Sequence, residues 1–577
     1  MGASMPGETK AELVQVKGNG FEPRIVAFFC NWCTYLAADL AGTSRVKYAA
    51  NIRVIRTMCS GRVDPQFVLD AFARGADGVL IGGCHPGDCH YQEGNYKTLR
   101  RVHMLRRVLH EMGIEDERFR LEWISASEAE RLKTVVNDMV EKVRALGPRK
   151  GQGTRETGQG KRDSGVENLA SELQARILKS AQICTGGTVP SELDAPSNCA
   201  CPDPQGGSVE SQPIETVRNT ESSGQSPLSL VPFPLPLVAP SPEPRVPSPE
   251  PPAPSAKPKV AFYWCASCGG CEETVLDLDE RVLDVVAAVD IVFWPVALDF
   301  KRHDVEAMPD GSILAAFVNG AVRSTEQEEM AHLLRRKAKV LVALGACAQM
   351  GGIPGLANLS SRQGVLESSY CESPSTVNPE RVFPQTAFKQ NGFSVSLPEL
   401  FRTVRTLDQV VDVDYYLPGC PPTAKILWKA VQVLLSGNLP PKGTVLAPDR
   451  ALCDECPRKD TRPEKLTLKE FKRPQDVMID EQTCMLAQGV ACMGPATRSG
   501  CEALCPQGNM PCTGCFGPTS RVRDYGAKAL SSIASIIDSN DEAEIEQIVQ
   551  TVPDPVGMFY RYSLPASMLR RKRLEER

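Results

Sequence analysis

Eight cysteines lie within the 63 residues from Cys453 to Cys515, and their spacing is typical of metal ligands. The stretch begins and ends with C-x-x-C and has proline or glycine beside several cysteines. Such a loop-rich stretch has little apolar core, so its stability depends on the metal that its thiolates bind. Eight thiolates are enough for two centres. In sequence order they divide into Cys453, Cys456, Cys484 and Cys492, and then Cys501, Cys505, Cys512 and Cys515.

Two zinc sites are the main alternative for these eight cysteines, because zinc also takes four thiolates. No histidine follows His332, which excludes mixed cysteine and histidine sites in this region. Structural disulfides are a weaker alternative. The first twenty residues show no export signal, so we expect a cytoplasmic location, where clustered thiols are more often metal ligands or redox groups.

Five further cysteines follow predicted strands near the N-terminus: Cys30, Cys33, Cys59, Cys84 and Cys89. Ligands on a parallel sheet gather at the carboxyl ends of the strands, where helix N-termini lower the pKa of thiols. Four of the five would make one iron–sulfur site, and the fifth would be a spare or alternate ligand. A thioredoxin-like dithiol at Cys30 and Cys33, and a zinc site using His85 or His90, remain open alternatives.

A third set of cysteines also follows predicted strands: Cys268 and Cys271 in S-C-G-G-C, Cys347 in L-G-A-C-A, and Cys420 in L-P-G-C-P-P. Small residues beside each cysteine let backbone N–H groups approach the sulfurs of a cluster. The four therefore form a plausible four-thiolate site. Simple core packing is the weaker interpretation for them, but it is the better one for Cys265 and Cys371.

Parallel strands connected by helices must position these cysteines. Within residues 24–148, short apolar runs predict strands at 24–29, 52–56, 78–81 and 121–124, and the stretches between them predict helices at 64–74, 93–112 and 127–145. Residues 258–445 predict strands at 259–264, 290–294, 338–344 and 411–416, and helices at 270–285 and 325–336. We therefore expect two α/β domains, each with a parallel sheet.

The composition changes between these domains. Residues 149–257 are rich in glycine, serine, glutamine, glutamate and proline, with twelve prolines from Pro232 to Pro258. This composition predicts a long disordered linker that would connect the domains without fixing their arrangement. Its cysteines are interpreted as free thiols: Cys184, Cys199 and Cys201.

Three other segments complete the predicted organisation. An N-terminal extension covers residues 1–23, a loop-rich cysteine region covers 446–525, and a helical tail covers 526–577. The tail ends in the basic run Leu569-Arg570-Arg571-Lys572-Arg573. We interpret this end as solvated or as partner-binding.

The overall composition excludes several classes of function. The chain has 577 residues, 42% hydrophobic content and a formal net charge of −5, which gives no reason to expect nucleic acid binding. No apolar run of about 18 residues occurs, so no membrane span is predicted. The motifs G-x-x-x-x-G-K-[ST] and H-E-x-x-H are missing, as is a convincing G-x-G-x-x-G after a strand. We predict a protein that conducts electrons rather than one that transforms a substrate.

Two stretches resemble subunits of methyl-viologen-reducing NiFe hydrogenase. Residues 24–146 resemble its delta iron–sulfur subunit through F-F-C-N-W-C, R-T-M-C-S-G-R-V-D-P and G-G-C-H-P-G-D-C-H-Y-Q-E-G-N-Y-K. Residues 259 to about 525 resemble its gamma, or small, subunit through S-C-G-G-C-E, P-G-C-P-P, C-D-E-C-P-R, C-M-G-P-A-T-R and P-C-T-G-C-F-G-P. The resemblance implies a natural fusion with an α/β fold: two parallel-sheet, flavodoxin-like domains, a long disordered linker and a loop-rich C-terminal iron–sulfur domain.

The resemblance also implies cluster roles. The set from Cys268 to Cys420 matches the ligands of a proximal 4Fe-4S cluster, and we call it the proximal set. The set from Cys453 to Cys492, the distal set, has cysteine at 453 where many NiFe hydrogenases have histidine. The set from Cys501 to Cys515, the medial set, has Cys505 where enzymes with a three-iron cluster have proline, so three 4Fe-4S clusters are expected. The five N-terminal cysteines, the N-terminal set, match a delta subunit that holds a 2Fe-2S cluster.

The paired C-x-x-C motifs that bind nickel and iron in the large subunit of a hydrogenase are absent from the chain. We therefore expect the non-catalytic iron–sulfur subunit of an oxidoreductase, within a higher-order hetero-oligomer. The implied partners are a NiFe hydrogenase large subunit, which supplies electrons from dihydrogen, and a flavin-containing heterodisulfide reductase-like subunit, which accepts them. An electron-transfer role in another complex, such as one with formate dehydrogenase, and a zinc-stabilised scaffold without redox function remain alternatives.

Overall fold

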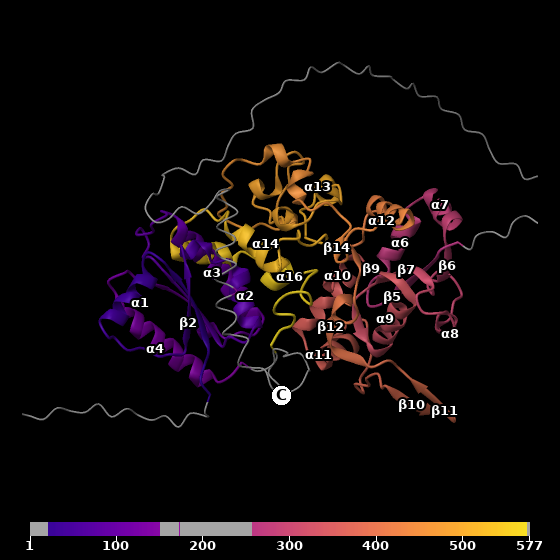
Figure 1. The fold of residues 1–577 in the computed structure, drawn as a ribbon, viewed down its shortest axis with the longest axis horizontal. Coiled ribbons are helices and arrows are strands. Elements are labelled where there is room, and N and C mark those ends of the chain that lie inside the picture. The colour runs from indigo at the N-terminus through magenta and orange to yellow at the C-terminus, as the bar shows by residue number, and fades with distance from the viewer. Residues whose placement is uncertain (1–20, 150–171, 173–256, 574–577) are drawn as a thin grey trace, which may run out of the picture. The chain divides into compact units, whose positions relative to one another are not determined.

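Short apolar runs form a four-stranded parallel sheet in the N-terminal domain, in the order β2-β1-β3-β4 (Figure 1). The computed structural model describes residues 21–149, 172 and 257–573, which belong to one compact unit. The strands are β1 (Ile25–Cys30), β2 (Ile52–Thr57), β3 (Gly78–Gly83) and β4 (Phe119–Trp123). The helices are α1 (Thr34–Thr43), α2 (Pro65–Ala73), α3 (Gly94–Glu111) and α4 (Ala129–Leu146).

Helices cover both faces of this sheet. On β1, Ile25 and Phe29 pack with α1 and α4, whereas Val26 and Phe28 pack with α2 and α3. This alternation is the period of two expected for a strand that is buried on both faces. The predicted parallel α/β fold of this domain is confirmed, but α1 is absent from the predicted elements.

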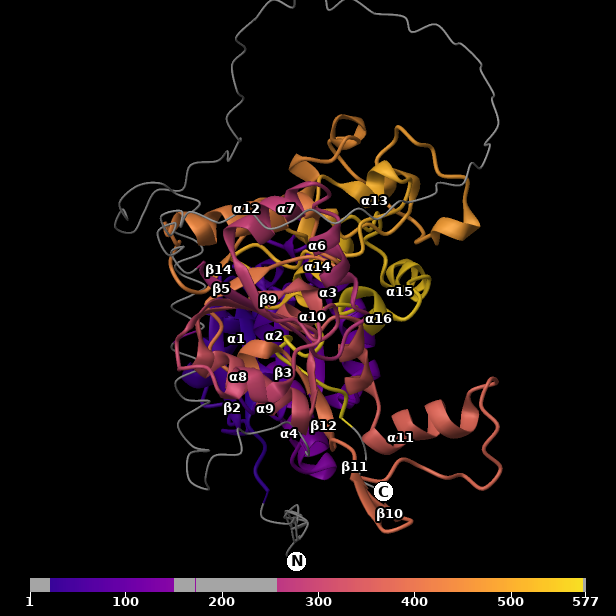
Figure 2. The same ribbon diagram turned by 90° about the vertical axis from the view of Figure 1, so that its right-hand side faces the viewer.

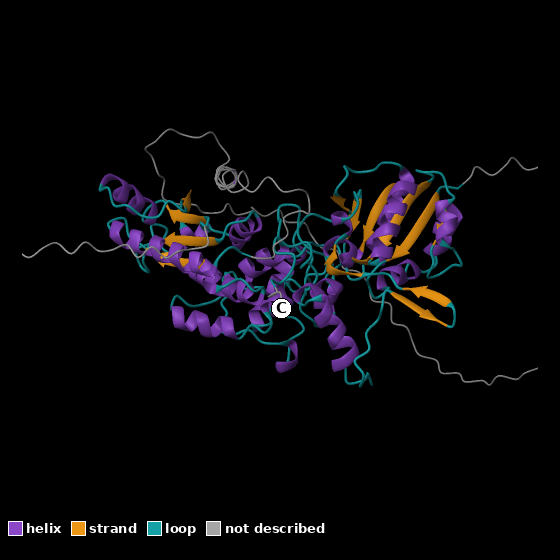
Figure 3. Cartoon of the chain, turned by 90° about the horizontal axis from the view of Figure 1, so that it is seen from below, coloured by secondary structure: helices purple, strands orange, loops and turns teal. Residues whose placement is uncertain are grey.

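A six-stranded parallel sheet forms the second domain, in the order β14-β13-β9-β7-β5-β6. Figure 3 shows its strands in orange, with helices on both faces. The strands are β5 (Lys259–Trp264), β6 (Asp290–Phe293), β7 (Ile313–Asn319), β9 (Ala338–Leu344), β13 (Tyr415–Leu417) and β14 (Thr444–Val445). The helices are α6 (Gly270–Leu276), α7 (Arg281–Ala288), α8 (Arg302–Glu306), α9 (Thr325–Lys337), α10 (Gly345–Met350) and α12 (Ala424–Ser436).

Three predictions for this domain are wrong in detail. The helix predicted at 270–285 is two helices, because the chain turns between α6 and α7, where Asp279 has a φ of 54°. The strand predicted at 411–416 begins only at Tyr415. The central strand β7 is absent from the predicted elements.

A segment between α10 and β13 leaves the sheet and returns to it. It contains α11 (Arg362–Glu367), a hairpin of β10 (Ala387–Gln390) and β11 (Phe393–Ser396), and β12 (Leu400–Arg405), which pairs with β8 (Val322–Ser324). Figure 2 shows the hairpin projecting from the second domain. All four residues of β11 are exposed.

Residues 446–524 are mostly loops and short 3₁₀ turns, with one four-residue helix, α13 (Leu504–Gln507). Three helices follow: α14 (Tyr525–Ala534), α15 (Glu542–Gln550) and α16 (Pro555–Phe559). Asp524 caps α14, since its carboxylate accepts a hydrogen bond from the Ala527 N–H at 2.9 Å. Among the described residues, no helix is long and apolar enough to cross a membrane.

One face of α3 holds the N-terminal domain against the C-terminal helices. Arg100, His103, Arg107 and Glu111 recur every three or four residues, so they share a face of the helix. Arg100 Nε donates to the Ser539 carbonyl at 2.8 Å, and His103 Nε2 lies 3.2 Å from the Glu542 carboxylate. We call this contact the α3 seam.

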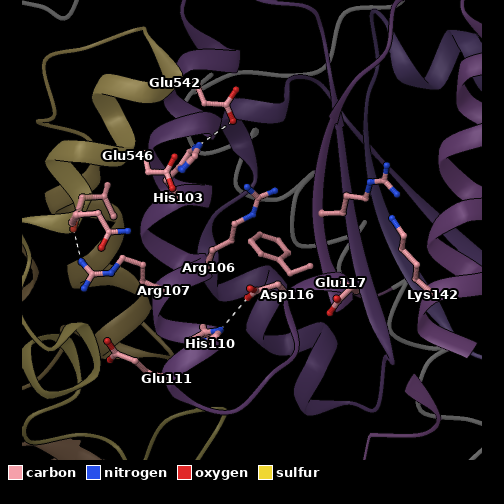
Figure 4. A pocket seen from close by; sticks show the side chains of 14 residues that line it. His103, Arg106, Arg107, His110, Glu111, Asp116, Glu117, Lys142, Glu542 and Glu546 are labelled. Atoms are coloured by element: carbon pink, nitrogen blue, oxygen red, sulfur yellow. Dashed lines mark hydrogen bonds and ion pairs between the residues drawn. The ribbon is translucent and has the colours of Figure 1, made fainter. Parts of the chain in front are cut away.

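The α3 seam continues to the C-terminal end of α15. Arg107 donates to the carbonyls of Val549 and Val552, the latter at 2.8 Å, and the Glu111 carboxylate accepts from the Val556 N–H at 2.9 Å. Figure 4 shows Arg107 and His103 beside the helix that carries Glu542. The cavity of about 770 Å³ next to them is lined by cations and carboxylates in similar number, so it selects neither charge.

The described part of the basic tail makes contacts within the chain, while Arg570 is exposed. Leu569 is buried. The Arg573 N–H donates to the Met112 carbonyl at 2.8 Å, and its guanidinium bonds to Glu115. The Lys572 N–H donates to the Asn358 carbonyl at 2.9 Å. The tail thus contacts both α/β domains.

These contacts join the elements on the two sides of the predicted linker, which alone would not fix their arrangement. Apolar residues of α2 and α3 and of α14, α15 and α16 belong to one continuous core. Such a shared core requires a defined relative position of the elements that form it. Residues 1–20, 150–171, 173–256 and 574–577, which include most of the predicted linker, lie outside the described residues.

Candidate metal centres

The five cysteines of the N-terminal set lie at the carboxyl ends of neighbouring strands. Cys30 ends β1, Cys59 follows β2, and Cys84 follows β3. All five side chains are buried. The Sγ atoms of Cys30 and Cys84 are 3.7 Å apart, and those of Cys59 and Cys89 are 3.9 Å apart. The structure therefore brings together residues that are up to 59 positions apart in the sequence.

The two sulfur–sulfur distances fit thiolates that share one metal ion. With a metal–sulfur bond of about 2.3 Å, two thiolates on a tetrahedral ion lie about 3.8 Å apart. The pair Cys30 and Cys84 and the pair Cys59 and Cys89 both match this spacing. Two such pairs are what a two-iron cluster requires. The Cys33 sulfur lies within 4.8 Å of the sulfurs of Cys30 and Cys84.

The thiols of this set compete for negative charge. Hydrogen bonds from the Cys33 and Cys84 thiols lower the pKa of Cys30 to about 3. The hydrogen bond to Cys30 raises the pKa of Cys33 to about 12, and burial raises the pKa of Cys59 to about 12. Several thiolates can coexist here only if positive charge is added, which is what iron would supply.

Backbone groups approach these sulfurs closely. The Gly61 N–H donates to Cys59 Sγ at 3.4 Å. A Cβ at Gly94, the first residue of α3, would lie 2.1 Å from Cys59 Sγ, so only glycine fits beside the site. The N-terminus of α3 thus lies beside Cys59, where the helix dipole favours negative charge.

The proximal set also lies at strand ends. Cys271 lies in α6, just after β5; Cys347 lies in α10, which follows β9; and Cys420 follows β13. Burial raises the pKa of Cys347 to about 12, and the charges of Cys420 and Cys268 add to this effect. Burial likewise raises the pKa of Cys271, with contributions from the other three cysteines. The four predicted residues are therefore close enough to interact.

Glycines shape the space around the proximal set. A Cβ at Gly345 would lie 2.3 Å from Cys271 Sγ, and one at Gly352 would lie 2.3 Å from Cys347 Sγ. Both glycines have positive φ, of 82° and 56°. Larger residues would occupy the space beside the sulfurs, so the glycines fit a site that holds a bulky inorganic group.

Charge interactions among the C-terminal eight cysteines link members of each predicted group. Burial raises the pKa of Cys453 to about 12, with further contributions from the thiolates of Cys492, Cys456 and Cys484. Burial also raises the pKa of Cys515 to about 12, with contributions from Cys501 and Cys505. Cys512 interacts both with Cys515 of its own predicted group and with Cys492 of the other.

The three sets are contiguous. The Cys512 N–H of the medial set donates to Cys492 Sγ of the distal set at 3.3 Å. Cys515 of the medial set interacts with Cys420 of the proximal set, whose backbone N–H also stabilises the Cys515 thiolate. The medial set therefore lies between the other two.

The spacing in these three sets does not suit a single tetrahedral ion. Within the described part of the chain, one group of three or more ligand atoms lies within 4.8 Å of one another, and it is Cys30, Cys33 and Cys84. Four thiolates around one zinc ion would all be about 3.8 Å apart. In a four-iron cluster each thiolate binds a different iron, so wider spacing is expected. The three donor sets are therefore more widely spaced than one tetrahedral ion requires, as iron–sulfur clusters allow.

Residues without a sequence signal support the medial set. Tyr525 Oη and Thr497 Oγ1 are 2.9 Å apart, and Thr497 Oγ1 is 3.6 Å from Cys512 Sγ. Burial raises the pKa of Tyr525 well above its ordinary value, so its hydroxyl stays protonated. Nothing in the local sequence predicts this contact, because it joins a loop to a helix 28 residues away.

A buried arginine lies between the distal and medial sets. Arg458 is 3% exposed and donates to four neutral acceptors: the carbonyls of Asp480, Thr483 and Pro506, and Asn509 Oδ1. A buried cation bound to neutral groups is favourable where anionic clusters lie nearby. This residue was not predicted, since an isolated arginine usually lies at the surface.

The remaining cysteines differ from these sets. Cys265 is buried in the apolar core beside β7, as packing predicts. Cys371 is half-buried on a π-helical turn. No disulfide links the cysteines of the described residues. Cys184, Cys199 and Cys201 lie outside the described residues.

Two family profiles match the chain. The family described as methyl-viologen-reducing hydrogenase, delta subunit, matches residues 25–147, and the family described as NADH ubiquinone oxidoreductase, 20 kDa subunit, matches residues 268–434. The first match covers the domain with the N-terminal set. The second covers the domain with the proximal set.

Relatives with curated names agree with this division. The iron-sulfur G subunit of the F420-non-reducing hydrogenase of Archaeoglobus profundus is 42% identical over 317 residues, which are 54% of this chain and 98% of that protein. The iron-sulfur D subunit of the vhc F420-non-reducing hydrogenase of Methanococcus voltae is 60% identical over 128 residues, which are 22% of this chain and 89% of that protein.

A third relative carries the delta-type domain in a different setting. The A subunit of the ferredoxin/F420H2-dependent CoB-CoM heterodisulfide reductase of Methanosarcina acetivorans is 52% identical over 126 residues, which are 22% of this chain and 16% of that protein. The same domain is therefore part of a hydrogenase in one relative and of a heterodisulfide reductase chain in another.

The fold and the cysteine sets define an iron–sulfur subunit of a hydrogenase, an oxidoreductase, rather than its catalytic subunit. The chain belongs to the iron–sulfur subunits of the F420-non-reducing hydrogenases. It joins a delta-type and a small-type subunit in one polypeptide, which confirms the expected fusion.

Proposed function

We propose that the chain carries electrons from dihydrogen oxidation in a separate NiFe large subunit to a heterodisulfide reductase-type flavoprotein. Electrons enter at the proximal set and pass through the medial and distal sets. They then leave through the N-terminal set. The observation that carries this proposal is the contiguity of the sets, through Cys515 with Cys420 and through Cys512 with Cys492.

The proposed cofactors are three 4Fe-4S clusters and one 2Fe-2S cluster. The proximal, medial and distal sets would each hold a four-iron cluster, and these groups would supply reversible one-electron transfer. In the N-terminal set, Cys30 and Cys84 would bind one iron, and Cys59 and Cys89 the other, as their sulfur distances favour. Cys33 would then be the spare cysteine.

The α3 seam supports the last step of the route. Cys492 of the distal set and Cys512 of the medial set belong to the same apolar core as Val68 of α2 and Leu99 of α3. The N-terminal domain is thus packed against the cluster-binding region. Electron transfer between the two requires such a fixed and close contact, because its rate falls steeply with distance.

Cysteine replacements in the complex with the large subunit test this proposal. Cys268→Ser should stop hydrogen-dependent reduction of the other clusters, followed by electron paramagnetic resonance. Cys84→Ser should remove the 2Fe-2S signal and block transfer to the heterodisulfide reductase-type partner, whereas Cys33→Ser should retain the signal. Cys265→Ala is the matched control and should retain every cluster. Normal cluster reduction in Cys268→Ser would contradict the proposed entry point.

A further inference from the structure

Large apolar side chains close to the N-terminal set along the chain remain exposed. They are Trp32, Leu36, Leu40, Met58 and Tyr91, with exposed fractions from 38% to 52%. We call these five residues the apolar collar. Trp32 also stacks on His90, whose ring centroid is 3.9 Å away, and His90 contacts the Tyr91 ring edge-on. Rings held in this way form a pre-organised surface.

The large apolar residues of helix α1 lie on its exposed face, whereas a helix at a free surface would bury them. Its buried positions are Thr34, Ala37 and Ala41, whereas Leu36 and Leu40 point outward. A helix that packs only on its own domain would place its large apolar residues inward. The outward leucines thus add to the exposed apolar surface of this domain.

The collar lies next to the cysteines in sequence as well as in space. Trp32 stands between Cys30 and Cys33, Met58 precedes Cys59, and Tyr91 follows Cys89 by two residues. The Met58 carbonyl lies 3.9 Å from Cys30 Sγ. Because all five cysteines are buried, a partner that takes electrons from them must approach over the residues that cover them.

We infer that the apolar collar is the docking surface for the heterodisulfide reductase-type protein that receives the electrons, which we call the acceptor. This inference rests on the proposed function and deepens it. The choice of occupant follows from the Methanosarcina acetivorans relative, in which a domain 52% identical to this one is part of the heterodisulfide reductase chain itself. Domain and acceptor therefore occur together in one polypeptide.

The α3 seam leaves the collar free for this acceptor. The seam uses α2 and α3 of the N-terminal domain, whereas Leu36 and Leu40 lie on α1, which packs on the opposite face of the sheet with α4. The domain thus has one side for the rest of its own chain and a separate side for the acceptor. Aromatic residues that are central in an interface usually dominate its binding energy.

The test uses the full chain, loaded with clusters, and as acceptor a purified heterodisulfide reductase A subunit that lacks a delta-type domain. Leu36→Lys and Tyr91→Lys each place a charge in the collar, and we expect at least about tenfold weaker binding of the acceptor by calorimetry. Leu146→Lys is the matched control. This leucine is also exposed, at 38%, but it ends α4, far along the chain from the cysteines, and its variant should bind within about twofold of the unmodified chain.

The outcomes separate the inference from the proposed function. If the unmodified chain binds the acceptor and both collar variants bind equally well, the collar is not the docking surface, although the proposed acceptor stands. The inference also fails if Leu146→Lys weakens binding as much as the collar variants do. If the unmodified chain neither binds nor reduces the acceptor, the proposed function itself is wrong at this step. Iron content per chain is measured for each variant, and an equal content assigns any lost binding to the surface.

Discussion

Replacing Arg107 should separate the two halves of the protein when they are supplied as two chains. Arg107 donates to the carbonyls of Val549 and Val552 at the end of α15, where a helix leaves carbonyls unpaired and favours cations. A hydrogen bond from a charged donor contributes about 1.5–3 kcal/mol. The side chain is only partly buried, so we take the lower value for each bond, which gives a loss of about 3 kcal/mol for Arg107→Met.

This loss corresponds to about 100-fold weaker association, since 1.4 kcal/mol is tenfold. The assay is calorimetric titration of residues 1–149 against residues 257–577, under anaerobic conditions. The matching D-type and G-type proteins are separate chains in the relatives, which indicates that the two halves can fold apart. Arg131→Met is the control, because Arg131 bonds only within its own domain, to Glu122 and to the Trp123 carbonyl. A change of less than about threefold for Arg107→Met would refute the reasoning, as would an equal change for the control.

Three further predictions concern single residues. Thr497→Val should lower the reduction potential of the medial cluster, because the Thr497 hydroxyl lies 3.6 Å from Cys512 Sγ and acts to lower the pKa of that thiol, so it favours negative charge there. Thr497→Ser should preserve the potential. Potentiometric titration followed by electron paramagnetic resonance would show an unchanged potential in Thr497→Val if the contact were incidental. Asp414→Asn should lower the unfolding temperature by about 5 °C, a loss of about 2 kcal/mol. Burial acts to raise the pKa of Asp414, but hydrogen bonds from Lys442, Arg335 and the Leu341 N–H together lower it. At any pH well above the ordinary pKa of about 3.9 the Asp414 carboxylate is therefore charged, and its stabilising effect is lost only as the pH falls below that value. The difference in unfolding temperature between Asp414→Asn and the unmodified chain should then stay constant from about pH 5.5 to 8. A difference that varies in this range would contradict the assignment. Cys265→Ala should cost about 1 kcal/mol of stability without loss of iron, and iron loss would make Cys265 a ligand.

The sequence predicted the parts of the protein that have a local signature. Strands such as Ile25–Cys30 are short apolar runs bounded by turns, and glycine beside a cysteine marks a close approach to a sulfur. The division of the eight C-terminal cysteines into two sets also rests on their order along the chain, and it stays a prediction. These features depend on residues a few positions apart, so they can be read without the fold.

The α3 seam could not be predicted in this way. Its contacts join residues more than 400 positions apart, such as Arg107 with Val552 and Arg100 with Ser539. A row of charged residues along a helix ordinarily indicates a solvated face. The same row here pairs with carbonyls and carboxylates of the C-terminal helices, and no local pattern distinguishes the two cases.

Helix α1 was missed for a related reason. Its large apolar residues point outward and its small ones inward, so the usual contrast between an apolar inner face and a polar outer face is lost. The departure from the ordinary pattern coincides with the surface that we assign to a partner. We attribute the failure of the local rules at α1 to the contact with a partner that we assign to it, and not to a low helix propensity of its residues.

The fusion itself should hide the effect of Arg107→Met in the intact chain. Because the two halves are joined in one chain, each has an effective concentration at the other on the order of 0.1 mM, below the millimolar value of short linkers. If the separate halves bind with a dissociation constant of about 1 nM, a 100-fold loss leaves about 0.1 μM, and the fused halves remain docked in nearly all molecules. Electron transfer from hydrogen to the N-terminal cluster should therefore be almost unchanged in the intact variant, although the two-chain form loses it at low concentration. Equal losses in the two forms would show that Arg107 affects the electron path itself rather than the association of the halves.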